Sequence, residues 1–361
     1  ALPSCPSGRG GDVCRSRRIA ICRMGRSRKP AACSEGHSCL VSRVTGMTPV
    51  DDTLQPFQLE NHAAQGRLVR LGDAMHQVLS AHDYPTEVAT LLGEVQVIAA
   101  LMSGTLKFEG VLSIQVKGDG PVSMLLVDIT TDGNMRGYAH FDPEKLQSVS
   151  ENEAGGPQQK VPRLLGNGYF ALTVDQGADT QPYQGIVPLE GATLAECAHG
   201  YLRQSAQLDA ALKVVVSQVD GKEGPTWRGG GIMVQKSVFS GFQSIDGEAI
   251  DADFEDAWRR AVIFLGSSTN EELLDVSLHP HDLLFRLFSE DGVRAFDPSP
   301  FAMKCRCSAD RVRNVLVSFP RDEIVSMKVG DDVVVTCEFC NVGYRFDVDQ
   351  IDTIFKDPAS G

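Results

Sequence analysis

Four cysteines near the C-terminus form two close pairs, and they constrain the fold of this chain more than any other feature. Cys305 and Cys307 are separated by one residue, Cys337 and Cys340 by two, and 29 positions lie between the pairs. Two such pairs, one entering a predicted helix and one following a predicted strand, can close tetrahedrally on zinc with bonds of about 2.3 Å. A closed set of four thiolates leaves no open coordination position, so the spacing predicts a zinc site without hydrolytic chemistry.

The spacing alone leaves two interpretations of this site open. A static zinc ribbon is as well supported as a switch, because four-cysteine sites are usually structural. The C-x-C pair is unusual, since its cysteines can be bridged only through a small strained ring, and strained exposed disulfides are the labile, regulatory kind. Zinc holds the sulfurs as thiolates, the oxidant-reactive form. Oxidation to two local disulfides would expel the metal and remove the main source of stability of this unit.

The other six cysteines favour a reducing compartment. Cys197 stands alone on the apolar stripe of a predicted helix, and five more lie in the first 39 residues, at Cys5, Cys14, Cys22, Cys33 and Cys39. A secreted disulfide scaffold would spread its cysteines through the folded body, so this layout predicts a cytoplasmic protein. Residues 1–46 have no helical or strand periodicity. We expect them to be a disordered extension, better explained as sequence upstream of a start at Met47 than as a targeting segment.

The charge of the chain argues against several classes of partner. The net charge is -13, although residues 1–46 hold nine Lys or Arg against two acidic residues, so the remainder carries 25 basic and 45 acidic groups. Such an acidic body repels phosphate backbones, and we expect no nucleic-acid partner. No uninterrupted run of eighteen apolar residues occurs, which argues against a membrane span. No nucleophile elbow, Walker loop or H-E-x-x-H motif is present, so we expect no enzymatic activity.

The hydrophobic pattern predicts an α+β fold in several parts. Residues 47–245 form a core domain of mixed helices and sheet, with a hairpin of strands near 106–117 and 122–129 and a helix that begins at a capping box of Thr193 and Glu196. Residues 246–300 contain helices with apolar faces but little core of their own. Residues 301–361 form a small unit with so little apolar material that we expect it to need a metal.

Several motifs in order resemble the heat-shock protein 33 family of bacterial redox-regulated chaperones. The resemblance covers about residues 60–355 and rests on C-x-C followed by C-x-x-C, and on the stretches 82–85, 104–110, 118–121, 183–189 and 283–288. It implies an N-terminal α+β core, a metastable helical linker at 246–300 and a C-terminal zinc domain. It also implies that one zinc ion and a redox switch belong to Cys305, Cys307, Cys337 and Cys340, with the disulfides Cys305–Cys307 and Cys337–Cys340 in the oxidised state.

In this family, oxidation unfolds the zinc domain and linker, favours homodimers and exposes surface that holds unfolding client proteins without ATP. The linker of this chain must borrow its burial from its neighbours, so loss of the zinc unit should expose apolar side chains that bind clients, namely Phe254, Trp258, Leu265 and Phe288. Two rival functions are weighed against this one. The near-neutral charge of residues 301–346 disfavours a nucleic-acid-binding zinc ribbon, and the strand before Cys337 disfavours a thiol oxidoreductase.

Overall fold

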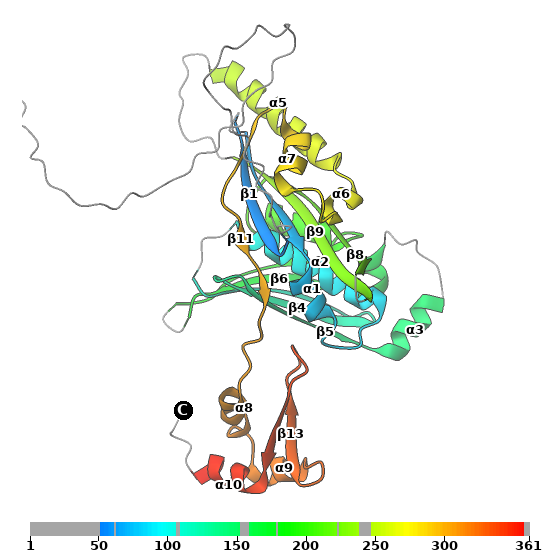
Figure 1. Cartoon of the computed structure of the whole chain (residues 1–361), viewed down its shortest axis with the longest axis vertical. Coiled ribbons are helices and arrows are strands. Elements are labelled where there is room, and N and C mark those ends of the chain that lie inside the picture. The colour runs from blue at the N-terminus through cyan, green and yellow to red at the C-terminus, as the bar shows by residue number, and fades with distance from the viewer. Residues whose placement is uncertain are drawn as a thin grey trace, which may run out of the picture. The chain divides into compact units, whose positions relative to one another are not determined.

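The computed structural model describes residues 51–60, 63–105, 109–151, 159–177, 180–221, 224–237 and 247–356. They form two six-stranded sheets, a two-stranded sheet and helices that separate or cover the sheets (Figure 1). All of them belong to one unit, Met47–Gly361. The predicted α+β fold class is confirmed, whereas the predicted extension 1–46 lies outside the described residues.

The first sheet is antiparallel and has the strand order β10-β1-β2-β9-β8, with β11 added to β1. Its strands are β1 (Thr53–Leu59), β2 (Ala64–Leu71), β8 (Ala210–Gly221), β9 (Gly224–Lys236), β10 (Val293–Ala295) and β11 (Ser299–Pro300). Phe57 lies opposite Gly66 in the pairing of β1 with β2. A Cβ atom at Gly66 would lie 2.1 Å from the Phe57 ring, so the ring fits on the sheet only because residue 66 has no side chain.

The second sheet has the order β12-β5-β4-β3-β6-β7 and is antiparallel except where β12 joins β5. Its strands are β3 (Val111–Gly118), β4 (Val122–Thr130), β5 (Asn134–Phe141), β6 (Gly168–Asp175), β7 (Tyr183–Pro188) and β12 (Ala302–Met303). The predicted hairpin is present as β3 and β4. Its first strand begins at Val111 and not near 106 as the alternation predicted. Gly110 has a φ of 124°, which breaks the extended run, and 106–108 lie outside the described residues.

Helix α2 (Thr86–Ser103) packs between the two sheets, touching β2, β8 and β9 of one and β3, β4 and β5 of the other. By length and composition this helix could span a membrane, although its sequence lacks an uninterrupted apolar run, but 72% of it is buried within the molecule. We therefore interpret α2 as the core helix. Around it lie α1 (Asp73–Leu79), α3 (Pro143–Glu151), the π-helical η1 (Val161–Leu165) and α4 (Leu194–Gln204).

The predicted start of α4 is confirmed, but its capping box is incomplete. The Thr193 hydroxyl accepts a hydrogen bond from the Glu196 amide at 3.2 Å. The Glu196 carboxylate accepts from the amide of Ala192 at 2.7 Å and not from that of Thr193. One side-chain bond in each direction still satisfies two amides at this helix end.

Three helices cover the outer face of the first sheet, namely α5 (Gly247–Gly266), α6 (Asn270–Leu274) and α7 (Pro280–Phe288). Their buried side chains form one apolar cluster with Phe57, Leu59, Leu68, Ile232 and Val234 of the sheet. Beyond Phe288 the chain forms β10, β11 and β12, which pair with core strands. The end of the segment predicted as a helical linker therefore consists of short strands, and its start lies outside the described residues.

The C-terminal unit is small. It contains α8 (Ala309–Leu316), α9 (Arg321–Ser326), β13 (Asp332–Thr336), β14 (Gly343–Asp347) and α10 (Val348–Lys356). Its buried apolar core consists of Leu316, Ile324, Val333, Phe346 and Ile351. A core of this size seldom stabilises a fold without a disulfide or a metal.

Candidate metal centre

The first cysteine pair lies in the short connection between the second sheet and α8. The amide of Lys304 donates to the Met135 carbonyl at 3.0 Å, so the chain is still hydrogen-bonded to β5 one residue before Cys305. Immediately after Cys307, the Ser308 hydroxyl accepts from the Arg311 amide at 3.2 Å and caps α8. The loop that carries both sulfurs is thus fixed by a backbone hydrogen bond at one end and by a side-chain cap at the other.

The second pair lies in a tight turn between β13 and β14. The Cys337 amide donates to the Val342 carbonyl at 2.9 Å, and the Asn341 amide donates to the Cys337 carbonyl at 2.8 Å. Asn341 has a φ of 57°, in the left-handed region that asparagine tolerates better than most residues. This turn directs Cys337 and Cys340 toward the first pair.

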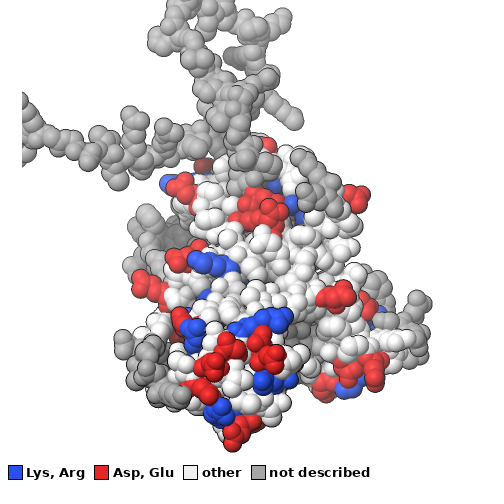
Figure 2. All heavy atoms as spheres, turned by 60° about the horizontal axis from the view of Figure 1, so that its bottom comes forward, with Lys and Arg blue, Asp and Glu red and all other residues white. Residues whose placement is uncertain are grey.

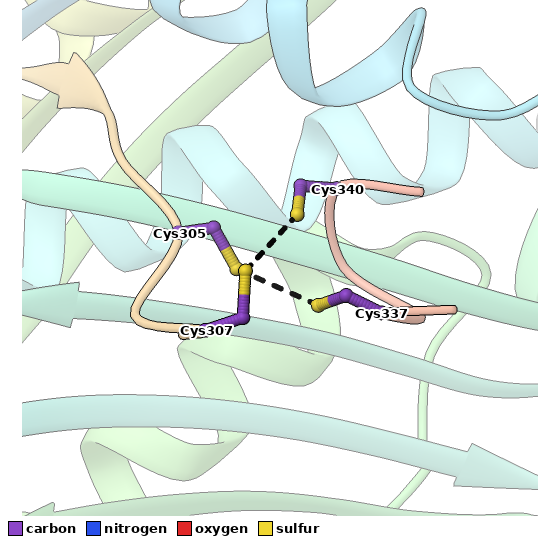
Figure 3. A group of neighbouring side chains, drawn as sticks. All are labelled: Cys305, Cys307, Cys337 and Cys340. Atoms are coloured by element: carbon purple, nitrogen blue, oxygen red, sulfur yellow. Dashed lines mark hydrogen bonds between the residues drawn. The ribbon is translucent and has the colours of Figure 1, made fainter. Parts of the chain in front are cut away.

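The four sulfur atoms converge on one point (Figure 3). The Sγ atoms of Cys305 and Cys337 are 3.7 Å apart, those of Cys307 and Cys340 are 3.4 Å apart, and all four lie within 4.8 Å of one another. A tetrahedral site with zinc–sulfur bonds of about 2.3 Å has sulfur–sulfur edges of about 3.8 Å. The donor set therefore fits a tetrahedral metal ion, and the four predicted cysteines are positioned to bind one.

Electrostatics indicate what a bound cation would do for this cluster. Burial raises the pKa of Cys337 and of Cys340. Burial also acts on Cys305, but hydrogen bonds from the Cys307 backbone and from neighbouring thiols lower its pKa to about 7. Without a metal, the four sulfurs would therefore not all ionise together near neutral pH. A bound cation is the usual means of holding such a set as thiolates.

Tyr344, on β14, contacts the cluster from outside. Its hydroxyl donates a hydrogen bond to Cys307 Sγ at 3.1 Å. This bond and the nearby sulfurs raise the pKa of Tyr344 to about 12, so the phenol stays protonated as a donor. Sequence reasoning placed Tyr344 on an alternating strand but gave it no role, because nothing in that pattern reveals a contact with a cysteine 37 positions away.

The predicted client-binding residues lie apart from the sulfurs, on the helices that cover the first sheet. Leu265 and Phe288 are buried against that sheet, and Trp258 packs half-buried beside them. Phe254 is half-buried, with the Lys236 ammonium 5.7 Å from its ring centroid. The two sets of predicted residues thus occupy separate parts of the fold.

Sequence reasoning missed the residues that join the cysteine loops to the core. Arg306 forms an ion pair with Asp128, and Phe339 lies beneath the guanidinium of Arg136. The only sequence signal was the position of each residue, as a spacer between two ligands. Their partners are more than 170 positions away.

The family model described as Hsp33 protein matches residues 52–347 of this chain. A 33 kDa chaperonin of Caulobacter vibrioides is 44% identical over 299 residues, which cover 82% of this chain and 95% of that protein. A 33 kDa chaperonin of Methylobacillus flagellatus is 33% identical over 308 residues, covering 85% and 95%.

The fold is also similar to the crystal structure of the 33 kDa chaperonin, a heat shock protein 33 homolog, from Thermotoga maritima. The TM-score is 0.65 at 19% identity, and the match covers 86% of this chain and 100% of the other. The family model includes all four cysteines of the candidate site, and the relatives match along nearly their whole length. This chain belongs to the Hsp33 protein family of chaperones.

Proposed function

We propose that this chaperone is a redox-regulated holdase of the cytoplasm, inactive while its four cysteines hold one zinc ion and active after oxidation. The disulfides Cys305–Cys307 and Cys337–Cys340 would form under oxidative stress, the metal would leave, and apolar surface would become available to unfolding proteins. The observation that carries the proposal is the convergence of four sulfurs in a unit with a very small apolar core. Such a unit loses much of its stability with its metal.

The proposed redox step uses the four sulfurs of the cluster. Two thiolates form one disulfide by giving two electrons to an oxidant such as hydrogen peroxide, which is reduced to water. A second disulfide removes the remaining ligands. The closest sulfurs in the cluster belong to different pairs, so the local pairing is proposed from chain spacing and family resemblance. Peptide mapping of the oxidised protein tests that pairing.

The surface that would open lies between the linker helices and the first sheet. The rings of Phe57 and Phe288 stack with centroids 5.3 Å apart, and both side chains are buried. Separation of the helices would therefore expose apolar side chains on both partners, on the sheet as well as on α5 and α7. A contiguous apolar surface of this kind binds unfolded chains.

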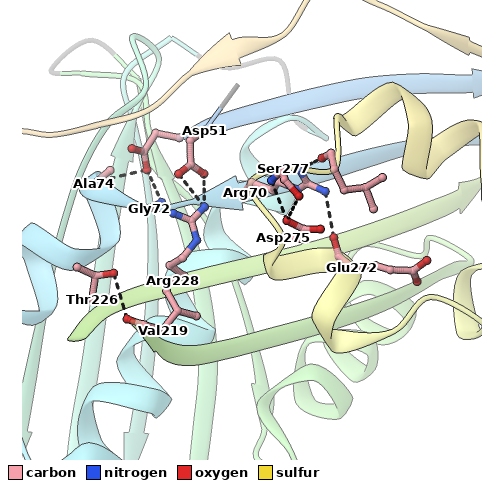
Figure 4. Close-up of polar contacts among 12 residues, drawn as sticks. Asp51, Arg70, Gly72, Ala74, Val219, Thr226, Arg228, Glu272, Asp275 and Ser277 are labelled. Atoms are coloured by element: carbon pink, nitrogen blue, oxygen red, sulfur yellow. Dashed lines mark hydrogen bonds and ion pairs between the residues drawn. The ribbon is translucent and has the colours of Figure 1, made fainter. Parts of the chain in front are cut away.

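Polar contacts also contribute to this docking. Arg70, buried on β2, donates to the backbone carbonyls of Leu278 and Glu272, the latter at 3.0 Å (Figure 4). Arg70 is only 3% exposed, and this burial lowers the pKa of its guanidinium. Opening would return Arg70 to water, and this gain in solvation offsets part of the lost contact energy. The net contribution of the Arg70 contacts to docking is therefore modest.

The charge on the described surface is consistent with protein clients. Figure 2 views the end of the molecule that carries the C-terminal unit, where basic and acidic side chains are interspersed without a continuous basic stripe among the described residues. Several of them are paired, for example Arg313 with Asp310 at 2.5 Å and Arg321 with Asp352 at 2.5 Å. The absence of a nucleic-acid or membrane partner stays a prediction, as does the homodimer proposed for the oxidised form.

The deciding experiment measures suppression of the aggregation of a heat-unfolded client by reduced and by peroxide-treated protein, with zinc release followed in parallel. We expect the reduced protein to hold one zinc and to be nearly inactive, and oxidation with mild heat to release the zinc and activate it. Cys337→Ser should abolish zinc binding. Cys197→Ala is the matched control, because burial raises the pKa of Cys197 to about 11 and keeps this thiol unreactive. Equal protection by untreated and oxidised protein would instead indicate a constitutive chaperone.

A further inference from the structure

Each cysteine pair encloses a spacer side chain that contacts the core. Arg306, between Cys305 and Cys307, places its guanidinium 2.6 Å from the Asp128 carboxylate on β4. Phe339, within the second pair, lies beneath the Arg136 guanidinium of β5, whose carbon is 3.8 Å from the ring centroid. Both cysteine loops therefore rest on neighbouring strands of the same sheet.

The two core residues are themselves joined. Arg136 and Asp128 are cross-strand partners, and their ion pair has an Nη2–Oδ2 distance of 2.7 Å. Asp128 is only 4% exposed, and its second oxygen accepts a hydrogen bond from Ser113 on β3 at 2.6 Å. Side chains of β3 and β5, the two neighbours of β4, therefore fix the position of this carboxylate. Arg306, Asp128, Arg136 and Phe339 form one continuous series of contacts that joins the two loops without passing through sulfur.

Further contacts hold the second loop from the other side. The Nε2 atom of His82 lies 2.7 Å from the Glu338 carbonyl oxygen, within hydrogen-bonding distance. The Tyr138 ring lies 6.3 Å from that of Phe339 and 5.9 Å from that of His82. The backbone of the C-x-x-C turn is thus fixed as well as its spacer side chain.

We propose that Asp128 and Arg136 are positioning residues for the metal centre, which hold the two cysteine loops in register through Arg306 and Phe339. The inference rests on the proposed zinc ligation by the four cysteines. A site whose ligands are already positioned loses less conformational entropy when it binds a metal, and a ligand that detaches is kept near its place. Loss of the Asp128–Arg306 pair should therefore make zinc leave sooner.

The test follows the transfer of zinc from the reduced protein to a chromophoric chelator, without oxidant or client. We expect Asp128→Asn and Arg306→Ala each to accelerate the transfer about tenfold, equivalent to about 1.4 kcal/mol. Because Arg306 acts through Asp128, the double variant should be no faster than Asp128→Asn alone. Arg306→Lys, which keeps the cation, should restore part of the slow release. Arg313→Ala is the matched control, since Arg313 is an exposed arginine of α8 that pairs with Asp310.

Hydrogen exchange of residues 304–308 and 337–341 in the same variants reports docking of the loops directly. Arg306 is only partly buried in a loop, so its variants should fold even if Asp128→Asn does not. Unchanged zinc release and unchanged exchange in the Arg306 variants would overturn the inference, as would additive effects in the double variant. Failure of the proposed zinc ligation has a different signature, because the reduced wild-type chain would then hold no zinc.

Discussion

Replacing Phe288 with alanine should open the linker while the metal stays bound. Phe288 is completely buried at the end of α7 and stacks on Phe57 across the contact between linker and sheet. It makes no contact with the sulfur cluster. Between α7 and Cys305 the chain first forms β10, β11 and β12. The substitution therefore separates the release of the linker from the oxidation of the switch.

The magnitude follows from the burial of the ring. Truncating a buried phenylalanine to alanine costs about 3–5 kcal/mol. The cost applies to the docked state alone, because the ring is exposed once the linker has left the sheet. A loss of about 3 kcal/mol raises the ratio of opened to docked linker by about two orders of magnitude. If docking is favoured by a few kcal/mol, as for typical locally unfolding segments, the opened form becomes a major species.

The assay compares client protection by the reduced, zinc-bound wild type and variant, with zinc content and hydrogen exchange of 253–288 measured on the same samples. We expect the variant to protect the client without oxidant and to exchange faster in the linker. Phe285→Ala is the matched control, because Phe285 is on the same helix but is 52% exposed. A variant whose linker exchanges quickly but which remains inactive while reduced would refute the idea that linker exposure is sufficient.

Three further predictions concern the sheet, the linker and the extension. Gly66→Ala should displace the ring of Phe57 and loosen the linker, which faster hydrogen exchange of α7 would show; unchanged exchange would mean that the ring is not seated as described. Burial lowers the pKa of His281, whose Nε2 atom lies 3.2 Å from the side-chain oxygen of Gln55. Docking of the linker should therefore weaken as the pH falls below about 6.5, because the opened linker binds the proton more readily. His281→Gln should remove this pH dependence in hydrogen-exchange measurements. A chain shortened to begin at Met47 should keep its zinc and its oxidative activation, and a large loss of activation would show that 1–46 contribute to the switch.

The metal centre could be predicted from the sequence because its signal is local. Two cysteine pairs with short spacers define possible ligands before any long-range contact is known, and a tetrahedral ion then dictates that they converge. Apolar stripes similarly predicted the helix at Trp258 and Leu265, because a buried helical face repeats every three to four residues. Such a pattern predicts that the apolar face of a helix is buried, and the structure shows that the first sheet buries it.

The contacts that join the cysteine loops to the core could not be predicted in the same way. Arg306 and Asp128 are 178 positions apart, and their pairing depends on the order of strands in the second sheet. In the sequence, Asp128 is simply a polar residue within an apolar strand, which has no distinct periodicity. A buried carboxylate needs a partner, but which cation supplies it depends on the tertiary fold.

The position of β12 suggests how the metal centre and the linker communicate. This strand has two residues, pairs parallel with β5, and is separated from Cys305 by Lys304 alone. So short a strand depends on its flanking segments, because it makes few hydrogen bonds of its own.

While the cysteine loops are docked through Arg306, β12 is held from its C-terminal side. Once the loops detach, the end of β12 is free to fray, and the segments next toward the N-terminus are β11, β10 and then α7 with Phe288. We therefore expect loss of the metal to reach the linker along the chain itself, through short strands whose pairing with the core is the least extensive in either sheet.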